Sequence, residues 1–134
     1  MIKNFNHVAI AVKSLDESLS LFENLFGLKA TKIETVPDQG VKAALIPIGS
    51  GEIELLEPID PNGGVAKFIA TRGEGIHHIC LEVDNTDKEL QSLAGKGVQL
   101  IDKVGRKGLA GRVGFIHPKS TKGVLIELAQ KVEH

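Results

Sequence analysis

Several features of a secreted, membrane-bound or nucleic-acid-binding protein are missing from this sequence. It has one cysteine, Cys80, so no disulfide can form within the chain, and no apolar run approaches the ~20 residues of a membrane helix. The first residues lack the apolar core of a signal peptide. The 16 basic and 17 acidic residues leave a formal charge of -1, which gives no basic field for a phosphate backbone. We therefore expect a cytoplasmic protein that binds neither membranes nor nucleic acids.

The remaining composition is that of an ordinary globular protein. The length of 134 residues is near the common size of one domain, and 42% of the residues are hydrophobic and 25% charged. We therefore expect a single domain, residues 1–134, with a packed core.

The first half of the chain predicts one strand, one helix and three more strands. Residues 5–12 have the character of a strand, because positions 8–12 are all β-branched or small and apolar. Ser14 and Glu17 have the spacing of a capping box, and Gly27 stands where a helix would end. Three further β-rich runs follow, divided by turn signals, at residues 29–36, 41–47 and 52–58.

The second half repeats this order. A strand is expected at residues 76–83 and a helix at 86–94, followed by strands at 98–103, 112–117 and 124–130. His7 and His78 are 71 residues apart, as are Leu19 and Leu90. The sequence predicts an α+β fold of two tandem βαβββ modules that form a curved mixed sheet around a central metal site. The modules are residues 1–60 and 76–134, and the linker 61–75 contains a short helix.

Each module supplies one histidine and one glutamate at matching places. His7 and His78 lie in the first strands, and Glu54 and Glu127 lie in the last strands, each within the letters IEL. A lone histidine in a strand is more often a core residue than a ligand, and duplication also copies structural residues. A buried carboxylate, however, is costly unless it is paired or bound to metal. Two imidazoles and two carboxylates suit a divalent ion such as Zn, Co, Ni, Mn or Fe.

Longer motifs in the chain resemble those of a known family. They are HVAIAVKSLDESLSLFENLFGL, PDQGVK, IELLEP, GIHHICLEVDN and FIHPKSTKGVLIELAQ. The paired modules resemble the vicinal-oxygen-chelate superfamily, whose members include glyoxalase I, extradiol dioxygenases and fosfomycin-resistance proteins. The motifs are most similar to those of the methylmalonyl-CoA epimerases of that superfamily, and the resemblance covers nearly the whole chain.

The resemblance implies a metal-dependent epimerase that acts on an acyl-CoA. His7, Glu54, His78 and Glu127 would hold Co, Zn, Mn or Ni, and Glu127 would also be a catalytic base. The enzyme would remove the acidic hydrogen of methylmalonyl-CoA, stabilise the enolate and return a proton to the opposite face. We also expect a homodimer, with Lys119 and Ser120 as candidate contacts for the coenzyme A phosphates.

Two points stay open in the sequence. The position of a second base proposed for some members of the family is occupied by Ala43, which leaves Glu34, Lys42, His117 or a water molecule as the second proton carrier. A glyoxalase-type lyase would have the same ligand pattern, although no glutathione-binding feature is visible. A resistance protein of this fold would bind its ligand without turnover, but it often has aromatics in its cleft, and this chain lacks Trp and Tyr.

Overall fold

The structure is a computed structural model that describes residues 1–131. In these residues the chain forms eight strands and three helices and divides into two compact units. One unit contains residues 7–77, and the other contains residues 1–6 together with the chain from residue 78 onward. Two strands, β1 (Ile2–Ala11) and β5 (Gly75–Val83), contribute residues to both units. The two units are described separately below.

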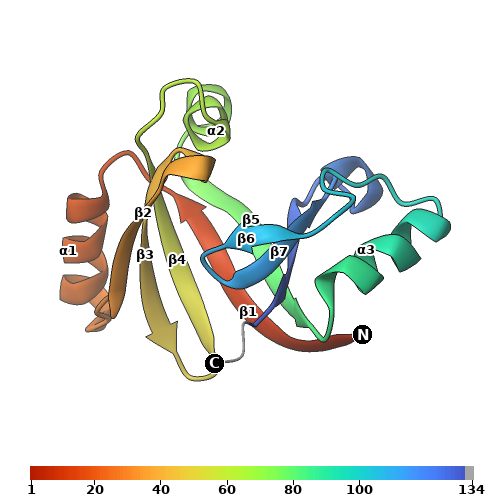
Figure 1. Ribbon diagram of the computed structural model, residues 1–134. Coiled ribbons are helices and arrows are strands. Elements are labelled where there is room, and N and C mark those ends of the chain that lie inside the picture. The colour runs from red at the N-terminus through yellow and green to blue at the C-terminus, as the bar shows by residue number, and fades with distance from the viewer. Residues whose placement is uncertain (132–134) are drawn as a thin grey trace. The chain divides into compact units, whose positions relative to one another are not determined.

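The first unit contains a four-stranded sheet in the order β2-β3-β4-β1. Its other strands are β2 (Lys32–Val36), β3 (Val41–Ile48) and β4 (Gly51–Pro58), and its helices are α1 (Leu15–Phe26) and α2 (Gly64–Arg72). β3 pairs antiparallel with β2 and β4, whereas β4 is parallel to β1. α1 packs on β3 and β4 (Figure 1).

Local signals at both ends of α1 explain its length. The Ser14 hydroxyl accepts a hydrogen bond from the Glu17 N–H at 3.2 Å, which satisfies one donor of the first turn. Gly27 ends the helix in the left-handed region, at φ 67°, and its N–H donates to the carbonyl of Glu23. Between these ends Leu15 lies in the core of the unit, which consists of Val12, Leu15, Ala44, Ile46 and Leu55.

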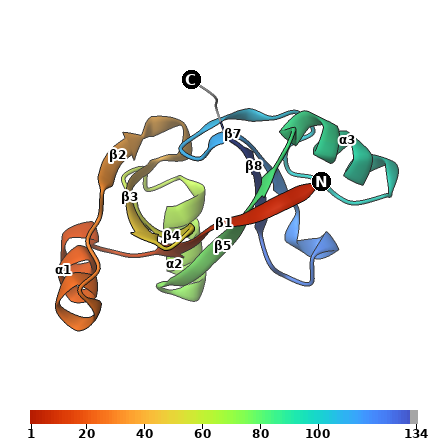
Figure 2. The ribbon, with the colours of Figure 1, turned by 90° about the horizontal axis from the view of Figure 1, so that it is seen from below.

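The second unit has the same arrangement. Its strands follow the order β5-β8-β7-β6, with β6 at Arg106–Gly108, β7 at Gly111–Ile116 and β8 at Ile126–Gln130. β5 is parallel to β8, and β7 is antiparallel to both β8 and β6. The helix α3 (Thr86–Gly95) packs on β7 and β8 (Figure 2). The core against this helix consists of Val83, Leu90, Ile116 and Leu128.

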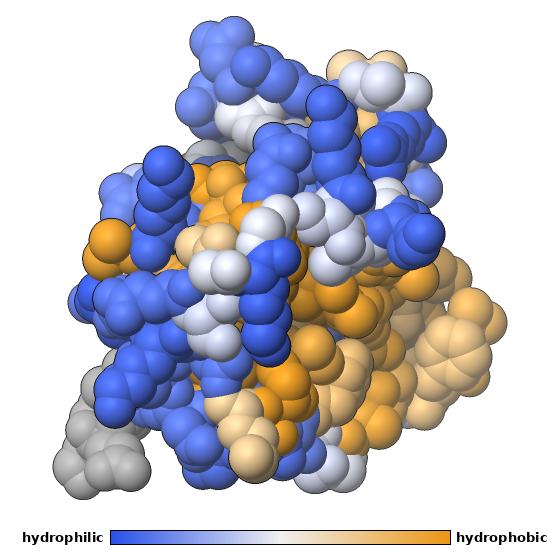
Figure 3. Space-filling model, turned by 90° about the vertical axis from the view of Figure 1, so that its right-hand side faces the viewer, coloured by the Kyte–Doolittle hydropathy of each residue, from blue (hydrophilic) through white to orange (hydrophobic). Residues whose placement is uncertain are grey.

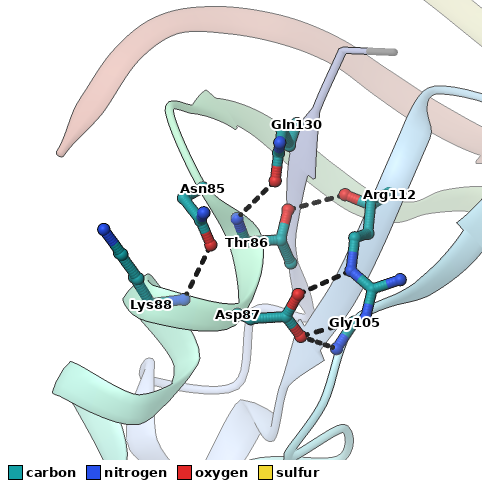
Figure 4. Close-up of polar contacts among 7 residues, drawn as sticks. All are labelled: Asn85, Thr86, Asp87, Lys88, Gly105, Arg112 and Gln130. Carbon is teal, nitrogen blue, oxygen red and sulfur yellow. Dashed lines mark hydrogen bonds and ion pairs between the residues drawn. The ribbon is translucent and has the colours of Figure 1, made fainter.

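A polar network fixes the start of α3 to this sheet (Figure 4). The buried Thr86 hydroxyl donates to the carbonyl of Arg112 at 2.6 Å, and the Thr86 N–H donates to the Gln130 side chain at 3.1 Å. Asp87 accepts from Arg112 Nε at 2.6 Å and from the Gly105 N–H at 2.7 Å. The hydrogen bond from Arg112, followed by that from Gly105, lowers the pKa of Asp87 below its usual 3.8.

One predicted strand is wrong. Residues 98–103 do not form a regular strand but make a single isolated bridge to β7. The N–H groups of Ile101 and Asp102 both donate to the carbonyl of Phe115, at 2.9 and 3.2 Å, so a regular ladder does not continue. The second strand of this module is instead β6, which pairs with β7 across a tight hairpin.

The predicted α+β class and the two βαβββ modules are confirmed. The linker contains the expected short helix as α2, while the last three residues of the predicted second module lie outside the described residues. No helix within residues 1–131 is long and apolar enough to cross a membrane.

Candidate metal centre

His7 and Glu54 form a buried pair in the first unit. In the register of β1 and β4, Ala9 lies opposite Glu54, so the side chain of Glu54 is on the same face of the sheet as those of Ala9 and His7. The distance between His7 Nε2 and Glu54 Oε1 is 3.5 Å. His7 is 2% exposed and Glu54 is 5% exposed. The alanines at positions 9 and 11 take up little space on this face.

His78 and Glu127 form the corresponding pair in the second unit. Cys80 lies opposite Glu127 in the register of β5 and β8, and Cys80 shares its face with His78. His78 Nε2 is 3.1 Å from Glu127 Oε1, and both residues are buried. The ring of Phe115 lies edge-on to the His78 ring, with 5.3 Å between centroids, which restricts rotation of the imidazole.

The geometry of both pairs suits metal coordination. At such low exposure a carboxylate without compensation would cost several kcal/mol. Two ligands that bind one ion at about 2.1 Å are about 3.0 Å apart in octahedral geometry and about 3.4 Å apart in tetrahedral geometry. The separations of 3.1 and 3.5 Å are close to these values. Each pair can therefore occupy two coordination positions of a first-row ion.

The structure adds one donor that the sequence did not predict. The buried Cys80 thiol lies on the face of His78, and Cys80 and Glu127 offer ligand atoms within 4.8 Å of each other. The alternation of His78 and Cys80 along one strand was the signal that could have identified it. A thiol at this place offers a softer donor than the imidazole and carboxylate beside it.

The predicted substrate contacts lie in the connection between β7 and β8. Lys119 and Ser120 belong to a short 3-10 turn, Pro118–Ser120, and both side chains are exposed. The Ser120 hydroxyl accepts from the Gln99 N–H at 2.8 Å, so it holds this loop in place. The Lys119 N–H donates to Nδ1 of His117. Neither residue is part of the two histidine–glutamate pairs.

Ala43 and Glu34 are neighbours in the first unit. Ala43 is buried, and the register of β2 and β3 places Glu34 directly opposite it, so the two side chains share a face. Lys42 lies on the other face of the sheet, opposite Thr35. Among the side chains that the sequence left open as the second proton carrier, Glu34 is therefore the one adjacent to Ala43. Glu34 also forms an ion pair with Lys32 at 3.2 Å.

Comparison with known proteins assigns the family. The family model of the Glyoxalase/Bleomycin resistance protein/Dioxygenase superfamily matches residues 6–115. The mitochondrial methylmalonyl-CoA epimerase of Dictyostelium discoideum is 38% identical, over 97% of this chain and 80% of that protein. The ethylmalonyl-CoA/methylmalonyl-CoA epimerase of Cereibacter sphaeroides is 35% identical, over 97% of this chain and 99% of that protein.

A solved structure agrees with these relatives. A methylmalonyl-CoA epimerase variant of Streptomyces coelicolor, in complex with 2-nitronate-propionyl-CoA, superimposes with a TM-score of 0.94 at 31% identity, over 98% of this chain and 96% of that chain. The chain therefore belongs to the glyoxalase superfamily and, within it, to the family of the methylmalonyl-CoA epimerases.

Proposed function

We propose that this protein interconverts the two epimers of methylmalonyl-CoA. The observation that carries the proposal is the buried histidine–glutamate pair that recurs in each module of a chain from this family. The solved relative with a bound acyl-CoA analogue supports a thioester of coenzyme A as the substrate class.

We further propose that His7, Glu54, His78 and Glu127 together hold one divalent ion, which is Co, Zn, Mn or Ni. Four nitrogen and oxygen donors suit such an ion, and these residues would hold it with coordination positions left for a chelating substrate. When bound, the ion supplies a Lewis acid that stabilises negative charge on the thioester oxygen. The buried pairs support the proposal because each carboxylate already faces an imidazole nitrogen.

The protein itself must take a proton from one face of the substrate carbon and return one to the other. Glu127 is the proposed base because its carboxylate is oriented by His78. One of its two oxygens can bind the metal while the other accepts the proton. Glu34 is the proposed second carrier because it lies beside Ala43. Lys119 and Ser120 remain proposed contacts of the coenzyme A phosphates.

Solvent exchange tests the proposed activity. Methylmalonyl-CoA should exchange its α-hydrogen for deuterium in D₂O when the protein is present, and a chelator should stop the exchange until metal is restored. Butyryl-CoA, which lacks the carboxylate, should exchange at least about 10²-fold more slowly, by analogy with the loss of one electrostatic stabiliser. No metal-dependent exchange, combined with turnover of a glutathione hemithioacetal, would identify a lyase instead. Binding without either reaction would indicate a sequestering protein.

The oligomeric state and the cellular location stay predictions. Apolar side chains lie exposed in the second unit, among them Met1, Ile2 and Val104, and Figure 3 shows an apolar area beside hydrophilic ones on the surface. Such areas are common where proteins associate. Light scattering on the full chain would test the predicted homodimer, and the cytoplasmic location needs imaging or fractionation.

A further inference from the structure

Arg106 lies on the face of the second unit's sheet that carries His78 and Glu127. In the strand registers Arg106 is opposite Val113, and Val113 is opposite Ala129. Residues directly opposite each other share a face, and Ala129 is two residues after Glu127 on the same strand. A fixed positive charge is therefore placed on the ligand-bearing face.

One aromatic ring connects this arginine to the metal ligand. The guanidinium carbon of Arg106 lies 5.5 Å from the centroid of the Phe115 ring. The same ring is 5.3 Å from the ring of His78, at an interplanar angle of 87°. Phe115 thus contacts both the guanidinium of Arg106 and the imidazole of His78.

Asp102 fixes the orientation of the guanidinium. Its Oδ1 is 3.2 Å from Arg106 Nε, and its Oδ2 accepts the N–H of Phe115 at 2.8 Å. A single carboxylate therefore holds both the Arg106 side chain and the backbone of Phe115. Because Asp102 contacts Nε, the two terminal nitrogens are the part of the guanidinium fork that an anion would meet. The Arg106 side chain is 42% exposed, so a ligand can reach it.

Two basic residues near Arg106 in the same hairpin lie on the opposite face of the sheet. Lys107 and Arg112 are opposite each other in the hairpin, on the other face of the sheet from Arg106. Arg112 is bound through two nitrogens to Asp87 and has a structural role at the start of α3. Lys107 is exposed and adds the same charge to the protein as Arg106 does, so it is a matched control.

We propose that Arg106 binds an anionic group of the acyl-CoA substrate, which is either the acyl carboxylate or a coenzyme A phosphate. Both groups present paired oxygens to the planar fork of an arginine, whereas a lysine offers only a point charge. This inference depends on the proposed function for the identity of the ligand. Loss of one charge-assisted contact should raise Kd and KM about 10- to 100-fold.

The experiment compares Arg106→Gln, Arg106→Lys and Lys107→Gln with the unmodified protein. Calorimetry gives the Kd for methylmalonyl-CoA and for methylmalonyl-pantetheine, which lacks the nucleotide phosphates, and deuterium exchange gives KM and kcat. We expect Arg106→Gln to raise Kd and KM while kcat stays within about threefold, and Lys107→Gln to change none of them. Arg106→Lys should recover only part of the affinity because the fork is lost.

The two thioesters identify the anion. A loss of affinity for both identifies the carboxylate, and a loss for methylmalonyl-CoA alone identifies a phosphate; either result supports the proposal. Equal Kd and KM for Arg106→Gln and Lys107→Gln with both thioesters would overturn it. Thermal melts exclude misfolding, and the lysine variant keeps the test valid if the glutamine variant is unstable. With racemic thioesters, calorimetry reports binding whether or not the protein epimerises them, so failure of the proposed epimerisation would be recognised separately in the exchange assay.

Discussion

The replacement of Glu127 by Gln should separate proton transfer from metal binding. Glu127 is 4% exposed and its Oε1 faces His78 Nε2 at 3.1 Å. The amide oxygen of Gln can take the place of Oε1 with nearly the same volume, so the free energy of unfolding should change by about 1 kcal/mol or less. The amide cannot accept the substrate proton. General bases contribute about 10² to 10⁴ in rate, so the barrier should rise by about 2.7 to 5.5 kcal/mol.

The assay measures the bound metal and the rate of deuterium exchange on the same samples. Glu127→Gln should retain substantial metal, lose at least about 10² in exchange rate and gain nothing from added Co or Mn. His7→Ala should bind metal weakly and recover part of its rate when metal is supplied.

Glu82→Gln is the matched control. Glu82 is another buried acid of the second unit, on the same strand face as His78, but its carboxylate pairs with Lys131 at 3.2 Å. The deuterium-exchange rate of Glu82→Gln should stay within about threefold of that of the unmodified protein, because proton transfer is proposed for Glu127 and not for Glu82. A metal-loaded Glu127→Gln protein with a near-normal rate would refute the base assignment and leave Glu127 as a ligand only.

Three further predictions concern the two units. Glu34→Gln should slow epimerisation by at least about 10-fold while methylmalonyl-CoA still binds, and an unchanged rate would remove it as the second proton carrier. Thr86→Val should lower the free energy of unfolding in urea by about 1 to 3 kcal/mol, because the buried hydroxyl donates to a backbone carbonyl, whereas the exposed Thr71→Val should change it far less. The lowered pKa of Asp87 stabilises the fold above its unfolded value near 3.8, and this contribution disappears as the pH falls through the folded value. Asp87→Asn should therefore lower the free energy of unfolding at pH 7 and make that free energy fall less steeply as the pH is lowered. If it falls as steeply as in the unmodified protein, Asp87 does not provide this pH-dependent stabilisation.

The sequence predicted the elements whose signals are local and repeated. The Ser14 cap and the terminal Gly27 set the ends of α1, and the strand alternation placed His7 on one face with Ala9 and Ala11, to which the register of β1 and β4 adds Glu54. These features depend on neighbours within a few residues, or on strand periodicity, and the repeat doubled the evidence for each.

Features that depend on contacts between residues far apart in the chain could not be predicted from the sequence. Val98 and Leu100 have the character of a strand, but their side chains pack against the core beneath α3 and their backbone does not continue a ladder. The stacking of Arg106 on Phe115 also depends on strand register, which a single sequence does not contain. The internal repeat of the sequence could not reveal this contact either, because the first module has neither an arginine nor a phenylalanine at the places of Arg106 and Phe115.

The second unit combines the beginning of the chain with its end. Residues 1–6 belong to it, and Lys3 forms an ion pair with Asp84 at 3.5 Å. During synthesis residues 1–6 leave the ribosome long before the rest of the second unit, from residue 78 onward, has been made. Residues 7–77 can therefore fold while residues 1–6 still lack the strands of their own unit. Such a segment is exposed to misassociation for most of the translation time. A rearranged gene that starts at residue 78 and appends residues 1–77 through a linker would make each unit continuous. Its product should aggregate less than the original protein during synthesis in cells.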